Sequence, residues 1–354
     1  MSLAVYDLHD LPKTRLNGQT AFLSDRQPAV RLLRNVLYVP PAHSLRDGDW
    51  GLLDEQDHIV VESVPQRGGR DSGDNIKPSL FNQKIDRIPD RNSVRYYAGS
   101  HYYLGFSAGH FGEFLVETLA KLWAYASFAD AISRVVVHRH ASTERFFDSQ
   151  PYARAVLEAA GVHADQIFAC RSPALFETMI VPESAFVIRG HVFPEMFNLT
   201  RNIGCNILRQ QGPTAASDQP LYLSRAHLAP GFRRLNGEAE VEYELGRRGA
   251  KIFHPEVHTI TEQIRIINAH DVVAGMVGSA LHLLLFSLTR KTVVYFEPRE
   301  WTSANYPMID KAMGHSSKFY FLDIPQPSGH PDYSPRDPED LGMLIDALIR
   351  DLGL

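Results

Sequence analysis

The chain has 354 residues, of which 44% are hydrophobic and 22% are charged, and its formal net charge is −5. Such a composition belongs to a globular protein and excludes a disordered tail, a collagen and an isolated coiled coil. The length suggests two domains, each large enough to bury its own core, and the acidic balance argues against a general nucleic-acid-binding protein.

The first 210 residues are interpreted as one N-terminal domain with an irregular, strand-containing start that continues as α/β structure. Apolar runs predict strands at 36–39, 59–61, 93–98, 134–137 and 178–181. Apolar periodicity predicts helices at 110–128, 152–160 and 194–210. The small, polar segment 211–219 is typical of a linker.

From residue 220 to 354 the pattern becomes regular. Strands are expected at 221–224, 251–253, 271–274, 292–296 and 319–322, and helices at 238–248, 261–268, 280–287, 304–313 and 338–352. Strands that alternate with helices predict a parallel sheet covered on both faces, which is a Rossmann-like α/β domain. The last helix is a candidate to pack back on the N-terminal domain.

Polar and small residues follow four of these strands. In open parallel sheets, ligands bind outside the carboxyl ends of the strands. The residues concerned are Ser224-Arg225, His254-Pro255-Glu256, Gly278-Ser279-Ala280-Leu281-His282 and Glu297-Pro298-Arg299. The turn at 278–282 opens a helix whose N–H groups attract an anion such as a diphosphate, and Arg225 can add a bidentate contact. The alternative is that Gly278 and Ser279 only turn and cap the helix.

The segment 110–123, HFGEFLVETLAKLW, carries a stripe of ionisable side chains. On a helix, one narrow face would hold His110, Glu113, Glu117 and Lys121, with leucines opposite. Two close carboxylates tend to raise one pKa toward the range useful for a general base. The alternative is the solvated face of an ordinary amphipathic helix.

Three weaker signals have simpler interpretations. The sequence Asp47-Gly48-Asp49 is interpreted as a turn, and His138 and His140 as a structural or solvated pair rather than metal ligands. The glycine-rich loop that carries Arg67 and Arg70 could contact phosphate, but a solvated loop is the simpler interpretation. We expect no cofactor and no essential metal.

Two segments together, 110–123 and 221–286, resemble the glycosyltransferase family 61 domain, which includes bacterial capsular polysaccharide biosynthesis proteins. The matching features of the second segment are Ser224-Arg225, Arg233-Arg234, Asn236, Glu238, Gln263, Ala269, Asp271 and the 278–282 turn. Their order and spacing carry the resemblance, which covers roughly the second half of the chain and the helix that begins at His110.

The resemblance implies an inverting glycosyltransferase with a GT-B-like fold: two Rossmann-like domains with the nucleotide-sugar site in the cleft. The implied substrates are a nucleotide-sugar donor, held by the C-terminal domain, and a saccharide acceptor, in capsular or other surface polysaccharide biosynthesis. The expected donor-binding residues are Arg225, Arg234, Asn236, His254, Glu256, Gly278, Ser279, Ala280, Leu281, His282 and Glu297. Relatives often carry histidine at the place of Glu113, whereas here it lies at His110, so the catalytic residue is one of Glu117, Glu113 and His110.

Two other functions are compatible with the same residues. One is a GT-B-like sugar-nucleotide epimerase or hydrolase, and the other is a non-catalytic binding or scaffold module of a polysaccharide assembly system. Residues 1–12 do not form a signal peptide, and no apolar stretch approaches the ~20 residues that span a bilayer. We therefore expect a cytoplasmic protein, with peripheral contact at the inner face of the cell membrane left open.

Overall fold

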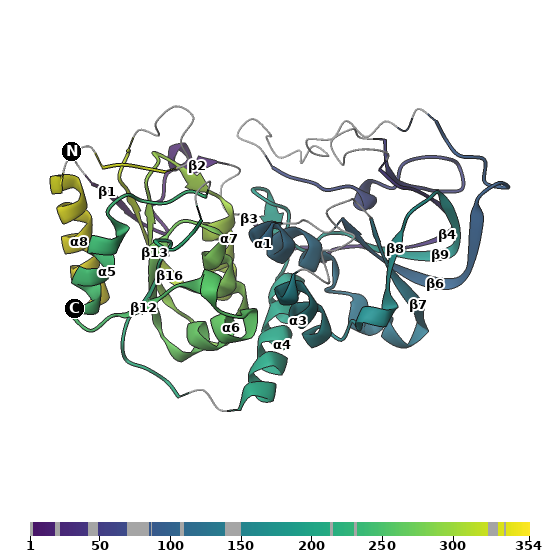
Figure 1. Cartoon of the computed structure of the whole chain (residues 1–354). Helices are drawn as coiled ribbons and strands as arrows, with labels where there is room; N and C mark the ends of the chain where they lie inside the picture. The colour runs from purple at the N-terminus through teal and green to yellow at the C-terminus, as the bar shows by residue number, and fades with distance from the viewer. Residues whose placement is uncertain are drawn as a thin grey trace. The chain divides into compact units, whose positions relative to one another are not determined.

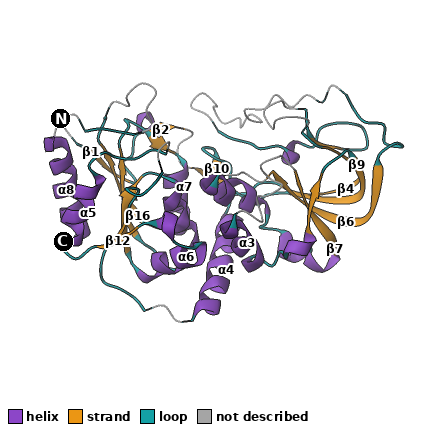
Figure 2. Cartoon of the chain, in the orientation of Figure 1, coloured by secondary structure: helices purple, strands orange, loops and turns teal. Residues whose placement is uncertain are grey.

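The computed structural model describes residues 3–17, 22–41, 49–68, 85, 87–106, 110–138, 150–212, 215–229, 232–324, 332–335 and 338–354. Its contacts divide the chain into two compact units (Figure 1): unit 1 comprises Met1–Ala21 and Gly204–Leu354, and unit 2 comprises Phe22–Ile203. Within the described residues, each unit contains one six-stranded sheet (Figure 2). No helix in these ranges is both long and apolar enough to cross a membrane.

The sheet of unit 1 has the strand order β12-β11-β13-β14-β16-β1. Its strands are β11 (Leu221–Leu223), β12 (Lys251–Phe253), β13 (Val272–Met276), β14 (Thr292–Glu297), β16 (Ser316–Phe321) and β1 (Ala4–Asp7). All neighbours are parallel except β1, which runs antiparallel to β16. The five strands predicted in the second half of the chain are confirmed. Their burial explains why apolar runs reveal them.

Helices cover both faces of this sheet (Figure 1). They are α5 (Glu238–Gly246), α6 (Ile260–Ala269), α7 (Asn305–Met313) and α8 (Pro338–Leu352). One buried cluster joins α5 and α8 to one face of the sheet, through Leu245 and Leu348 packed with Tyr222 and Phe296. The last helix therefore contributes to the core of unit 1. The predicted helix at 280–287 is a 3-10 helix, Ser279–Phe286.

The sheet of unit 2 has the order β5-β4-β9-β6-β7-β8 and is mixed rather than parallel. Its strands are β4 (Val30–Val39), β5 (Gly51–Leu53), β6 (Arg95–Phe106), β7 (Ile132–His138), β8 (Ile167–Cys170) and β9 (Ala174–Pro182). Strand β4 is antiparallel to both β5 and β9, whereas β6 is parallel to β7 and β9. This half thus departs from the expected all-parallel Rossmann-like sheet, because β4 and β5 follow one another without the helical crossover that parallel strands need.

The remaining elements are short strands and two helices. They are β2 (Leu16–Asn17) paired with β15 (Thr302–Ser303), β3 (Phe22–Leu23) paired with β10 (His191–Val192), α3 (Pro151–Ala159) and α4 (Pro194–Gln211). The predicted helices at 152–160 and 194–210 are confirmed. The predicted strand at 59–61 is wrong: Ile59 forms only an isolated bridge to Leu53, and a 3-10 helix, Val61–Ser63, follows.

The predicted long helix at 110–128 is not a continuous α-helix. Helix α1 (Phe111–Glu113) passes into a π-helix, Phe114–Thr118, and then into a 3-10 helix, Leu119–Lys121. The stripe at 110, 113, 117 and 121 has spacings of three and four residues, which an α-helix accommodates, so the pattern alone did not reveal the change of helix type. Single-turn π-helices occur frequently at functional sites.

Both ends of the predicted N-terminal domain, residues 1–21 and 204–210, belong to unit 1, whereas the stretch between them forms unit 2. Strand β1 completes the sheet of unit 1 by pairing with β16, with Ala4 opposite Phe321. The contacts divide the chain at 21/22 and 203/204, whereas the linker was predicted at 211–219. Within that predicted linker, residues 213 and 214 lie outside the described residues.

Candidate functional site

The topology of unit 1 indicates where a ligand would bind. In chain order, its parallel strands are arranged 2-1-3-4-5, and the order reverses between β11 and β13. Ligands of doubly wound sheets bind in the crevice outside the carboxyl ends at such a switch point. The residues that leave β11 and β13 there are Ser224-Arg225 and Val277-Gly278.

The Arg225 side chain lies directly on Gly278. A Cβ atom added at position 278 would stand 1.9 Å from Arg225 Nη1, closer than any real contact. The backbone at Gly278 is extended, with φ −177°, a conformation open to every residue. Glycine is therefore needed here for the close approach of the guanidinium.

Arg225 is 9% exposed and is anchored at two points. Its backbone N–H donates to Glu238 Oε1 at 3.0 Å, and its Nε donates to the carbonyl of Arg233 at 3.0 Å. Among the described residues, no carboxylate accepts a hydrogen bond from the guanidinium. Burial lowers the pKa of Arg225, and repulsion by Arg233 lowers it further.

Three arginines converge on Tyr306, on α7. Burial raises the pKa of the Tyr306 hydroxyl to about 12, while Arg233, Arg225 and Arg299 act in the opposite direction. Arg299 is neutralised by Glu297, which accepts two hydrogen bonds from it at 2.8 and 2.7 Å. Among the described residues, neither the Arg225 nor the Arg233 guanidinium forms an ion pair with a carboxylate, and two such cations suit an anionic ligand.

The other predicted donor residues have varied surroundings. Arg234 makes a bidentate ion pair with Asp332, at 3.1 and 2.6 Å, and Asn236 donates to Ser334 Oγ at 2.7 Å. His254 shares a 2.8 Å hydrogen bond with Glu242. These three side chains are thus engaged in internal contacts.

The residues at the other strand ends differ in exposure. Glu256 is exposed and acts electrostatically on Arg225. Of the 3-10 helix, Ser279 and Ala280 are partly exposed, Leu281 belongs to the core, and the ring of His282 stacks on Tyr306 at 5.3 Å.

Glu238, a residue of the family pattern, supports the site from the start of α5. Its carboxylate accepts hydrogen bonds from the Tyr222 hydroxyl and from the backbone N–H of Arg225, both at 3.0 Å. The side chain is 1% exposed, and burial raises its pKa to about 7. Glu238 therefore holds the backbone that presents Arg225.

In unit 2, the ionisable stripe is largely buried rather than solvated. Arg67 Nη2 donates to Glu113 Oε1 at 3.0 Å and to Glu117 Oε2 at 2.8 Å, and its Nε donates to Glu117 Oε1 at 3.3 Å. The side chain of Glu113 is 39% exposed and that of Glu117 only 10%. Arg67, whose loop was predicted to be solvated, thus binds both carboxylates. His110 precedes α1 and is exposed.

Lys121 continues the stripe into the interior. Its ammonium donates to the carbonyl of Glu62, and burial lowers its pKa to about 8. Nearby, His138 is fully buried, contacts the Tyr103 hydroxyl and stacks on Tyr38. His138 is thus a core residue, while His140, Asp47, Gly48 and Arg70 lie outside the described residues. No group of three or more potential ligands among the described His, Cys, Asp and Glu side chains could hold a metal ion.

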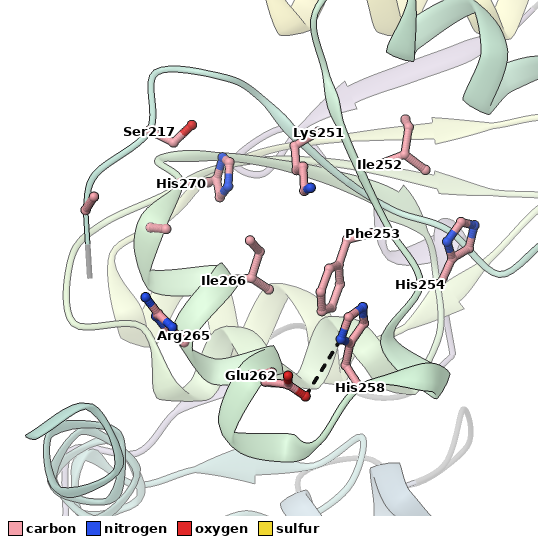
Figure 3. Close-up of a pocket in the computed structure, with 12 residues that line it drawn as sticks. Ser217, Lys251, Ile252, Phe253, His254, His258, Glu262, Arg265, Ile266 and His270 are labelled. Atoms are coloured by element: carbon pink, nitrogen blue, oxygen red, sulfur yellow. Dashed lines mark ion pairs between the residues drawn. The ribbon is translucent and has the colours of Figure 1, made fainter. Parts of the chain in front are cut away.

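A separate pocket of about 470 Å³ runs along the edge strand β12 (Figure 3). Lys251 and Phe253 of β12 and Glu262 and Arg265 of α6 line it, and His258 faces Glu262 at 3.7 Å. Of the predicted donor residues, His254 alone lines this pocket. Because the strand order reverses between β11 and β13, the arginine cluster there is the better candidate for the donor site.

The sequence placed Arg299 among the residues at the strand ends but not among the donor-binding residues. It offered Arg67 only as a possible phosphate contact, and it did not point to Tyr306. Arg299 lies two residues after the end of β14, which is the signal that marked it, whereas Arg67 and Tyr306 are brought in by the fold alone.

No curated protein matches the chain. Residues 111–295, more than half of the chain, match the model of the family Glycosyltransferase 61. This match takes in Glu113, Glu117, Arg225 and Gly278 and confirms the resemblance seen in the sequence. The family implies glycosyltransferase activity in general, and the chain belongs to the glycosyltransferase 61 family.

Proposed function

We propose that the protein is an inverting glycosyltransferase of GT-B-like architecture that moves a hexosyl or pentosyl group from a nucleotide sugar to a saccharide acceptor. The process we assign to it is capsular or other surface polysaccharide biosynthesis. In one displacement, the acceptor oxygen bonds to the anomeric carbon and the bond from that carbon to the diphosphate oxygen breaks. The observation that carries the proposal is the buried Arg225 guanidinium seated on Gly278 at the switch point.

The leaving group is a nucleoside diphosphate, which gains negative charge as it departs. Arg225 and Arg233 supply positive charge at the carboxyl end of the sheet, and the guanidinium of Arg225 has no carboxylate hydrogen-bonded to it among the described residues. A preorganised cation is worth most where charge develops in the transition state. We assign leaving-group stabilisation to Arg225, assisted by the N–H groups at Ser279 and Ala280.

For the general base we favour Glu113 over Glu117 and His110. A base must accept the acceptor proton on an accessible lone pair. Both oxygens of Glu117 accept from Arg67 and its side chain is buried, whereas Glu113 uses one oxygen for Arg67 and is 39% exposed. His110 is exposed too, so H110Q and E113Q, assayed side by side, separate the two.

We propose further that no metal is essential, since the arginines can neutralise the diphosphate. Activity unchanged in EDTA is the expected result. Activity lost in EDTA and restored by Mn²⁺ would overturn this part of the proposal.

The decisive experiment measures donor binding and turnover separately. Calorimetry with a panel of UDP and GDP sugars, and with CMP sugars as the monophosphate contrast, should show that one class of nucleoside diphosphate sugar binds. R225A should weaken that binding more than tenfold, about 1.4 kcal/mol. R247A, an exposed arginine of the same unit, is the matched control. Unchanged affinity in R225A would refute the donor site.

Turnover then separates the possible functions. Nucleotide released only when a saccharide acceptor is present supports transfer, and release without an acceptor indicates hydrolysis. A sugar nucleotide converted to its epimer indicates an epimerase. Binding with no turnover for any acceptor tested indicates a scaffold module.

A further inference from the structure

Arg67 connects two carboxylates that are separated from it in sequence by 46 and 50 residues. One edge of its guanidinium, Nε and Nη2, is directed at Glu117, and the second N–H of Nη2 reaches Glu113. Side-chain exposure is 17% for Arg67 and 10% for Glu117, so this part of the contact is shielded from water. Such geometry fixes an orientation as well as a charge.

The two carboxylates are used differently. Glu117 gives both oxygens to Arg67, whereas Oε2 of Glu113 makes no hydrogen bond within the described part of the chain. The Glu113 carboxylate, on a side chain that is 39% exposed, is therefore held by one oxygen, and its other oxygen is left unused by the described residues. The turn that carries Glu117 is the π-helix, Phe114–Thr118, so Glu113 lies at the point where the helix type changes.

Charges of both signs surround the pair. Arg67 and Lys121 are cationic, and Glu113 and Glu117 are anionic. Burial raises the pKa of Glu117, and attraction to Arg67 opposes that rise, as does Lys121 to a smaller degree. Lys121 in turn is acted on by Glu62, Glu117 and Glu183, and Arg67 repels Arg189. Without Arg67, two neighbouring carboxylates would compete for one proton.

We propose that Arg67 is a positioning residue, which holds Glu113 by one oxygen, leaves the other oxygen to the acceptor and shields Glu113 from the charge of Glu117, and that Glu117 is the counter-ion that holds Arg67 in place. The catalytic side of this inference rests on Glu113 being the base of the proposed transferase. The electrostatic side does not, because it concerns the interaction between the two carboxylates in the protein without substrate.

The first experiment therefore needs no activity. Carboxyl carbons are labelled with ¹³C in glutamate, the Glu113 signal is assigned with E113Q, and the signal is titrated in wild type, R67Q and R67Q/E117Q. In R67Q, the titration of Glu113 should broaden and its midpoint move upward as it couples to Glu117. In the double variant, the second carboxylate is gone and the midpoint should return toward the wild-type value. Glu113 titrating identically in all three proteins would overturn the inference.

The second experiment tests the role in turnover. The acid limb of the kcat profile should move up by about one pH unit in R67Q, a loss of about tenfold at a pH on that limb. It should recover in R67Q/E117Q and in R67K, with donor KM unchanged. R91Q removes an arginine of the same unit that pairs with Asp57 outside this cluster, and should leave the limb in place.

The outcomes separate the two claims. An equal loss of kcat at every pH in R67Q and in the double variant would indicate a purely structural Arg67 and refute the inference. An NMR shift in a protein that transfers no sugar to any acceptor would refute the proposed function and the catalytic role of Arg67, while its electrostatic control of Glu113 would stand.

Discussion

The Arg225 guanidinium occupies the space that a side chain at position 278 would fill, with Nη1 only 1.9 Å from the place of a Cβ atom. One residue comes from the end of β11 and the other from the end of β13, the two strands at which the sheet order reverses. Glycine at 278 is thus part of how the arginine is presented. A larger residue at position 278 would therefore displace the guanidinium.

We predict that G278A displaces the Arg225 guanidinium and weakens donor binding at least tenfold, about 1.4 kcal/mol, in calorimetry. The extended backbone tolerates alanine, so most of the effect should appear in binding rather than in folding. G342A in α8, where a Cβ would meet nothing within 4 Å, is the control and should bind normally. Full donor affinity in G278A would contradict the placement of the phosphate site.

Donor affinity should fall as the pH rises through about 7. The pKa of Glu238 lies at about 7 because the carboxyl is buried, and its ionised form adds negative charge beside Arg225. An anionic donor therefore binds better when Glu238 is protonated. E238Q keeps an oxygen acceptor and should flatten the profile between pH 6 and 8, whereas E240Q, exposed on the same helix, should not. The same slope in E238Q and wild type would refute this assignment.

Arg234 should contribute little to donor affinity, although the sequence predicted it as a donor residue. Its guanidinium is held by Asp332 through two hydrogen bonds. We expect R234Q to bind the donor within about threefold of wild type and to lower the melting temperature slightly. D332N removes the same ion pair and should have a similar donor affinity and melting temperature. A much larger binding loss in R234Q than in D332N would restore Arg234 to the donor site.

His138 should make unfolding pH-dependent. Burial, assisted by the charge of Lys121, lowers its pKa from 6.5 to about 3. Between these values the unfolded chain binds a proton that the folded chain does not, so stability falls as the pH drops below 6.5. At pH 5 the penalty is about 2 kcal/mol. Urea titrations of H138F should lack this part of the slope, while H58Q, at an exposed site, should retain it.

The strands of unit 1 could be predicted from sequence because burial between two helical layers makes them continuous apolar runs. Strand β1 could not, because only alternate residues are partly shielded and its partner β16 lies at the other end of the chain. The mixed sheet of unit 2 was also missed. Whether neighbouring strands run parallel depends on pairing between distant segments such as β4 and β9, which no local pattern encodes.

The site was predictable where its residues follow strands. Arg225 and Gly278 both do, so topology alone brings them together. The burial of Glu117 and Lys121 was harder to predict. A charged stripe on a helix has the same spacing whether it faces water or packs against buried counter-charges. The stripe is buried because Arg67, from a glycine-rich loop, pairs with Glu117. No pattern in the sequence around Arg67 indicates this contact.

The pairing of β1 with β16 affects both folding during synthesis and the choice of fragment boundaries. Unit 2 is one continuous stretch and can complete its sheet during synthesis, whereas β1 must wait until the last strand has emerged. A fragment that starts at Gly204 would leave the outer edge of β16 without its partner strand. Unpaired edges template aggregation, so we expect an isolated unit 1 to stay monomeric only when residues 3–8 are joined to it, for example by circular permutation.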